Sequence, residues 1–104
     1  MKESNTQNYE DLIEKHQKFK EIKESSTAVD FDFASTNGDT LKEKSIILAN
    51  TLNQFQFDYV VGGPETLALL EIGNSTAKIE KDVLFPINEL LLVGSDPKLI
   101  KIKI

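Results

Sequence analysis

The stretch DYVVGGPETLALLEI, residues 58–72, predicts a short buried strand that turns sharply into a short buried helix. Residues 59–61 are apolar and mostly β-branched, as is typical of a strand covered on both faces. Gly63 is an acceptable N-cap, and Pro64 suits the first helical position because its φ is fixed and it lacks a backbone N–H. The leucines that follow wrap most of the circumference, so we expect a buried helix of about two turns that ends before Gly73.

A glycine-rich turn between a strand and a helix can also bind phosphate, because the free N–H groups of a helix N-terminus attract anions. This turn has neither the Gly-Lys-Ser/Thr ending of a P-loop nor a Gly-x-Gly-x-x-Gly pattern. Pro64 removes one donor, and Glu65 places a carboxylate where the phosphate would lie. We therefore interpret the turn as structural and expect neither a cofactor nor a small-molecule ligand.

Length and composition limit the classes of protein to consider. The chain has 104 residues, which is enough for one domain with a modest core. It has no cysteine, which excludes disulfides, thiolate catalysis and thiolate metal sites. The net charge of −5 argues against a nucleic-acid partner. No window approaches the roughly 18 uninterrupted apolar residues of a membrane span, and the N-terminus lacks an apolar signal region. We expect a soluble, intracellular protein that is not secreted and does not contact a membrane.

An amphipathic helix is predicted after a flexible polar tail of residues 1–8, and we assign residues 9–104 to a single α+β domain. Its apolar stripe includes the single histidine and comprises Tyr9, Leu12, Ile13, His16, Phe19 and Ile22. Acidic residues precede lysines by four positions on the wet side at Asp11–Lys15 and Glu14–Lys18. The stripe is shorter than the three or four heptads of a coiled coil, so we expect the helix to dock on its own domain or on a neighbouring subunit. His16 has no partner for a metal or catalytic site and indicates a core-edge residue.

Residues 28–34 predict a half-buried strand, because apolar and acidic side chains alternate along them and place Asp30 and Asp32 on the wet face. Such carboxylates, together with Asp39, would be the ligands of a divalent ion if the protein were an enzyme. The pattern departs from the Asp-x-Asp of haloacid dehalogenase-type phosphatases, because no apolar strand precedes Asp30. It also departs from a calcium loop, which requires Gly where Ser35 stands. Cation binding by Asp30 and Asp32 stays open, but we assign no metal site.

A capping box formed by Thr40 and Glu43 predicts the start of the next helix. Apolar residues recur at helical spacing from Leu41 to Phe55. From Phe55 the apolar period changes to two and continues as far as Val61. The helix is therefore expected to lead almost directly into the strand of the central stretch.

The C-terminal part of the chain predicts further strands. Ala77 and Ile79 indicate a brief edge strand, and residues 89–93, ELLLV, indicate a strand buried on both faces. Residues 98–104 alternate isoleucine with leucine and lysine, and a turn at residues 94–97 joins these two strands into a hairpin. The lysines would protect the last strand if it lies at the sheet edge. The predicted fold class is α+β, with a small mixed sheet, two or three helices and an N-terminal amphipathic helix.

The order of these elements resembles the shell-forming core of tailed-bacteriophage major capsid proteins. The residues that carry the resemblance are Leu41–Phe55, Phe57–Val61, Pro64–Leu70 and Glu89–Val93. In such capsid chains an apolar strand is often followed by a small polar residue, proline and a leucine-bearing helix; here glycine precedes the proline. Capsid proteins of this kind are much longer, so the resemblance implies a fragment or a reduced relative. It also implies a non-enzymatic structural protein that self-associates and is located in the virion or the host cytoplasm.

We therefore predict a self-associating protein with no catalytic residues, cofactor, metal, nucleic-acid or membrane partner. The predicted interface lies on the first helix and the last strand, at Phe19, Ile100, Ile102 and Ile104. The alternative is a small intracellular protein-binding or regulatory domain without enzymatic activity. An enzyme that uses Asp30, Asp32 and Asp39 around a divalent ion comes third.

Overall fold

The computed structural model describes residues 2–81 and 83–104, with side chains described from Glu10 onward. It confirms the α+β class, with three helices and one mixed sheet of five strands. In chain order the elements are α1 (Lys2–Ser25), β1 (Thr27–Asp32), α2 (Leu41–Leu52), β2 (Tyr59–Gly62), α3 (Pro64–Ile72), β3 (Ile79–Glu80), β4 (Glu89–Val93) and β5 (Lys98–Lys103).

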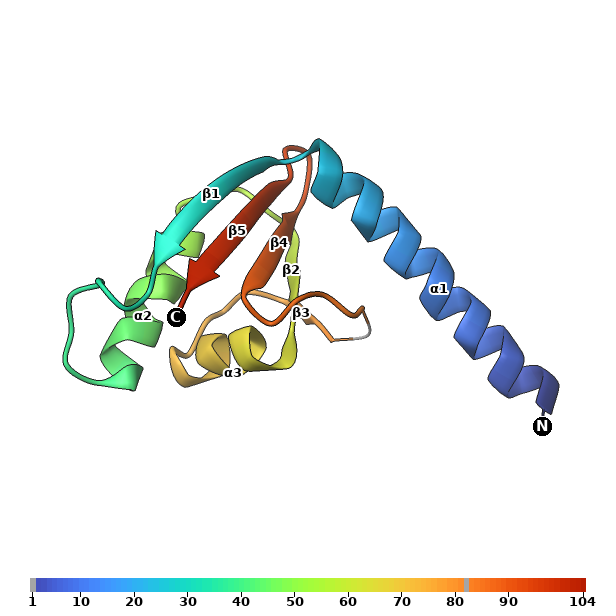
Figure 1. The fold of residues 1–104 in the computed structure, drawn as a ribbon, viewed down its shortest axis with the longest axis horizontal. Helices are drawn as coiled ribbons and strands as arrows, with labels where there is room; N and C mark the ends of the chain where they lie inside the picture. The colour runs from blue at the N-terminus through green and yellow to red at the C-terminus, as the bar shows by residue number, and fades with distance from the viewer. Residues whose placement is uncertain (1, 82) are drawn as a thin grey trace.

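The sheet has the strand order β1-β5-β4-β2-β3 (Figure 1). The two outer pairs, β1 with β5 and β2 with β3, are parallel, whereas β5, β4 and β2 pair antiparallel. The predicted β4–β5 hairpin is confirmed. The brief edge strand is present as β3, although Ala77, which was expected in it, precedes its first residue. The condition under which lysines would protect β5 is not met, because β1 pairs along its other side and makes β5 an interior strand. An alternating pattern distinguishes the two faces of a strand but not an edge strand from an interior one.

Helices α2 and α3 cover one face of the sheet and form the larger core with it (Figure 1). Leu48 and Leu52 of α2 are fully buried against the sheet, as is Leu70 of α3. Val60 points into this core, and Val61 points to the opposite face; both are fully buried. The central stretch is thus a strand enclosed on both faces followed by a nine-residue helix, as predicted.

The boundaries of α2 and α3 follow from local chemistry. The Thr40 hydroxyl accepts a hydrogen bond from the Glu43 N–H at 3.1 Å, which confirms the predicted cap. The Glu43 carboxylate accepts in turn from the backbone N–H of Asp39 at 3.0 Å, one residue before the position of a standard capping box. Helix α3 ends where Asn74 takes the left-handed conformation, with a φ of 56°. Gly73 lies against the backbone carbonyl of Ser45, so α3 approaches α2 where a Cβ would collide.

The period-two pattern begins later than predicted. Phe55 and Phe57 pack against the core of α2 and α3, whereas Tyr59 and Val61 pack on the opposite face of the sheet. The residues between α2 and β2 form turns, so side chains there do not alternate as in a strand.

Helix α1 contacts the second face of the sheet through its C-terminal turns. Phe19 is 5% exposed and packs with Val61, Leu91 and Val83. Its ring meets that of Tyr59 edge-on, with centroids 6.0 Å apart. Toward its N-terminus the helix runs away from the sheet, and the N-terminal end of the chain lies far from the rest of the molecule (Figure 1). The domain extends over 49 × 28 × 21 Å.

The first helix also differs from its predicted form. It begins at Lys2, so residues 2–8, assigned from the sequence to a flexible tail, are helical. Leu12 and Ile22 are half-buried, as the stripe predicts, but Ile13 is 42% exposed. Successive helical residues are about 100° apart, so Ile13 lies about 120° around the helix from Phe19 and faces away from the sheet. Tyr9, the first residue of the stripe, lies outside the described side chains.

Candidate functional site

The residues predicted to form an interface do not form one common surface. Ile100 and Ile102 are 2% and 1% exposed and lie in the core beneath α2 and α3. Phe19 is buried between α1 and the sheet. Ile104 is 67% exposed. The prediction assigned the isoleucines of the last strand to an interface, whereas α2 and α3 of the same chain cover Ile100 and Ile102. Only Ile104 of these four residues presents a largely exposed side chain to a partner.

The acidic residues of the metal hypothesis have other neighbours. Asp30 and Asp32 are exposed on β1, and in the parallel register they lie beside Lys101 and Lys103. The Asp32 carboxylate accepts hydrogen bonds from the Ser35 hydroxyl at 2.9 Å and the Ser35 N–H at 3.2 Å. These bonds, and more weakly the charge of Lys103, lower the pKa of Asp32 from its ordinary value. Within residues 2–81 and 83–104, no three carboxylates or histidines gather as metal ligands.

His16 is exposed on α1 instead of lying at the edge of the core. Its ring faces Phe85 of the loop between β3 and β4, with centroids 6.0 Å apart. The sequence pattern places this histidine on the apolar stripe of a helix that is expected to dock on its own domain or on a neighbouring subunit. In the structure α1 lies on the sheet at Phe19 but has already left it at His16, one turn closer to the N-terminus. The His16 ring therefore contacts the loop that carries Phe85 and not the sheet.

A groove lies where α1 separates from the rest of the domain. It has a volume of about 1060 Å³ and runs between α1 and the loop that follows β3. We call it the α1 groove; its lining residues are Asp11, Leu12, Glu14, Lys15, Lys18, Lys81 and Leu84. A smaller hollow of about 230 Å³ adjoins it between α3 and the same loop, and it shares Lys81 and Leu84.

The α1 groove combines apolar side chains with charged ones. Leu84 is 73% exposed and Leu12 is half-buried. The described ion pairs are Lys23–Glu89, Lys81–Glu71 and Lys98–Asp96. The predicted pairs Asp11–Lys15 and Glu14–Lys18 are therefore not formed, and these four side chains have no ion-pair partner among the described residues. Such a surface suits a partner that brings both apolar side chains and charges of both signs.

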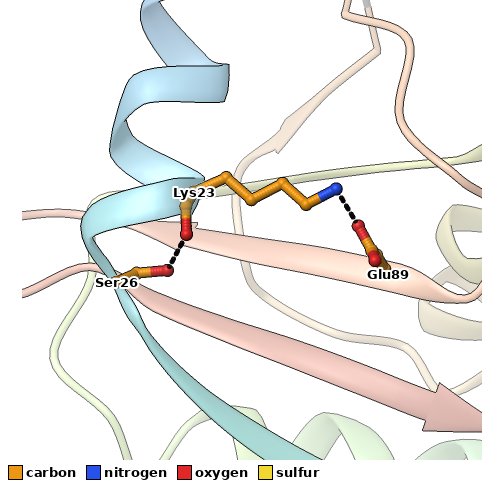
Figure 2. Close-up of polar contacts among 3 residues, drawn as sticks. All are labelled: Lys23, Ser26 and Glu89. Carbon is orange, nitrogen blue, oxygen red and sulfur yellow. Dashed lines mark hydrogen bonds and ion pairs between the residues drawn. The ribbon is translucent and has the colours of Figure 1, made fainter.

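A buried ion pair fixes the helix beside this groove. The ammonium of Lys23, near the end of α1, meets the carboxylate of Glu89 at the start of β4 (Figure 2). Both side chains are largely buried, at 25% and 17% exposed, and Glu89 Oε2 is fully buried, so the lysine charge compensates it. The same ammonium lies 5.6 Å from the centroid of the Phe85 ring. The Ser26 hydroxyl donates to the Lys23 carbonyl at 2.8 Å and closes the helix end (Figure 2).

Comparison with protein-family models, curated proteins and solved structures found no significant match. None of the helices described is long and apolar enough to cross a membrane.

The sequence contains two signals that point to the α1 groove, although neither identified it. Leu84 stands in a short apolar run that proline ends, and such runs are expected to be buried. The groove segment of α1 is acidic at Asp11 and Glu14 and basic at Lys15 and Lys18, but this spacing also predicts ion pairs within the helix, so the pattern did not distinguish a groove from a solvated face. Recognising the groove required knowing that α1 leaves the sheet.

Proposed function

We propose that this protein is a non-enzymatic structural subunit that acts by associating with copies of itself. The observation that carries the proposal is the shape of α1, a 24-residue helix whose C-terminal turns are fixed on the sheet while the rest extends beyond it. A helix that leaves its own domain exposes surface that further protein can cover.

Two further features support this proposal. Exposed apolar side chains lie on the projecting part of α1 and on the loop opposite it, at Ile13 and Leu84. The resemblance of the strand, proline and leucine-rich helix to a phage capsid core, described above, fits a subunit that functions through contact area. On that resemblance we place the protein in the virion or the host cytoplasm.

Sedimentation velocity on the full chain over a wide concentration range tests this proposal. Association predicts a sedimentation coefficient that rises with concentration, because specific interfaces that bury on the order of 1,200–2,000 Å² in total form by mass action. A chain that remains monomeric at millimolar concentration would refute it.

A second candidate, a domain that binds a different protein, is favoured by the free edge of β1. This strand pairs with β5 along one side only and lies at the end of the sheet. An edge strand of six residues can accept an added strand from a peptide. Capture of a defined cellular partner by the wild-type chain, lost when Ala28→Pro blocks this edge, would support this function over self-association.

A further inference from the structure

We propose that the α1 groove is the docking site for α1 of a second copy of this chain, with the two helices antiparallel about a twofold axis that passes between residues 14 and 15. This inference rests on the proposed self-association and specifies its geometry. In such an isologous dimer each helix enters the groove of the other copy.

The size of the groove fits a helix. An α-helix about 10 Å across that rises 1.5 Å per residue occupies roughly 120 Å³ per residue. A groove of about 1060 Å³ is thus of the order of the volume of a helical segment of two to three turns. The charged residues that line it extend from Asp11 to Lys18, a segment of similar length.

The charges of this segment determine the direction of pairing. Along α1 the lining charges are acidic at Asp11 and Glu14 and basic at Lys15 and Lys18. An antiparallel copy places Asp11 beside Lys18 of its partner and Glu14 beside Lys15, whereas a parallel copy in register places like charges together. The antiparallel arrangement thus gives partners to four side chains that have none among the described residues of the single chain.

The same arrangement covers the exposed apolar side chains. Ile13 lies two residues before Lys15 and so about 160° around the helix from it. The side of α1 that carries Lys15 faces the partner helix in this arrangement. Ile13 lies on the other side of α1 and therefore faces the far wall of the partner's groove, where Leu84 of the partner subunit lies. Ile13 and Leu84 are 42% and 73% exposed in the single chain. Their burial supplies the apolar contact that charges alone do not.

Paired charge-reversal variants test this geometry. The acidic variant is Lys15→Glu with Lys18→Glu, and the basic variant is Asp11→Lys with Glu14→Lys. Each alone should weaken the dimer at least about tenfold, because every cross-helix pair becomes a like-charge pair. An equimolar mixture should restore a heterodimer, measured by sedimentation and by native mass spectrometry. Lys42→Glu, an exposed position on α2 at the opposite face of the sheet, is the charge-reversal control and should dimerise as the wild type does.

The outcomes distinguish the antiparallel pairing of α1 from self-association in general. Association of both variants with wild-type affinity refutes the helix pairing but leaves self-association in place. A mixture that stays monomeric, although the wild type dimerises and circular dichroism shows all variants folded, also refutes the pairing. A wild-type chain that stays monomeric refutes both proposals. Ile13→Asp is an independent check: its side chain is exposed in the monomer, so loss of dimer without loss of folding supports the contact with Leu84.

Discussion

Replacing Lys23 by Met is predicted to leave a charge uncompensated between α1 and the sheet. Methionine keeps most of the apolar length of the lysine side chain and removes its ammonium group, so the buried carboxylate of Glu89 loses its counter-charge. Removing one partner of a fully buried ion pair costs about 3–5 kcal/mol. Here 25% and 17% of the two side chains remain exposed, so water reaches both groups and lowers the penalty. We expect the free energy of unfolding to fall by about 2 kcal/mol.

Urea unfolding followed by circular dichroism measures this change, which corresponds to a fall in Tm of about 10 °C for a domain of this size. The second variant of a double-mutant cycle is Glu89→Gln, which removes the opposite charge and keeps the side-chain shape. In the double variant neither charge is present. We therefore expect its loss of unfolding free energy to be about 1 kcal/mol smaller than the sum of the losses of the two single variants. Additive effects of the two substitutions would refute the reasoning, because independent sites show no coupling.

Three further substitutions test other parts of the argument. Phe19→Ala removes the buried ring that holds α1 on the sheet and should lower the free energy of unfolding by about 3–5 kcal/mol, measured by urea titration. Gly73→Ala places a Cβ against the Ser45 carbonyl and should cost more than the roughly 1 kcal/mol that Ala usually gains over Gly in a helix; an unchanged Tm would contradict the close approach of α2 and α3. Asp32→Asn tests a pH effect. The pKa of Asp32 is lower in the folded chain, so its stabilising contribution is present above its ordinary pKa and is lost as pH falls through the folded value. Below about pH 4 the free energy of unfolding of the asparagine variant should fall less steeply with decreasing pH than that of the wild type. Denaturant titration at a series of pH values measures both slopes.

The parts of the fold that sequence analysis predicted are those set by local chemistry. Gly63 and Pro64 mark the start of α3, and Gly73 and Asn74 mark its end. Thr40 caps α2 through a contact only three residues away. The β4–β5 hairpin follows from a short turn between two apolar strands. In each case the deciding residues are close in sequence, so the pattern contains the information.

The errors come from contacts between residues far apart in the chain. Strand β1 pairs in parallel with β5 and makes it an interior strand, and Ile100 and Ile102, predicted to lie at an interface, are buried in the core with α2 and α3. An apolar stripe shows that a face is covered but not whether the same chain or another covers it. Residues of one stripe on α1 have different surroundings. Phe19 is covered by the sheet of its own chain, whereas Leu12 lies over the α1 groove.

The anchor of α1 explains why its projecting part has a fixed direction. Starting a helix in water is unfavourable because several residues must be ordered before the first hydrogen bond is gained, whereas extending an existing helix is not. Phe19 and the Lys23–Glu89 pair hold the last turns of α1 on the sheet, so the preceding residues extend a helix that is already started. The direction of the helix, and with it the width of the α1 groove, is therefore set by β2, β4 and the loop that carries Phe85. The face of the sheet covered by α2 and α3 holds the larger core, and the opposite face determines the direction in which α1 projects from the domain.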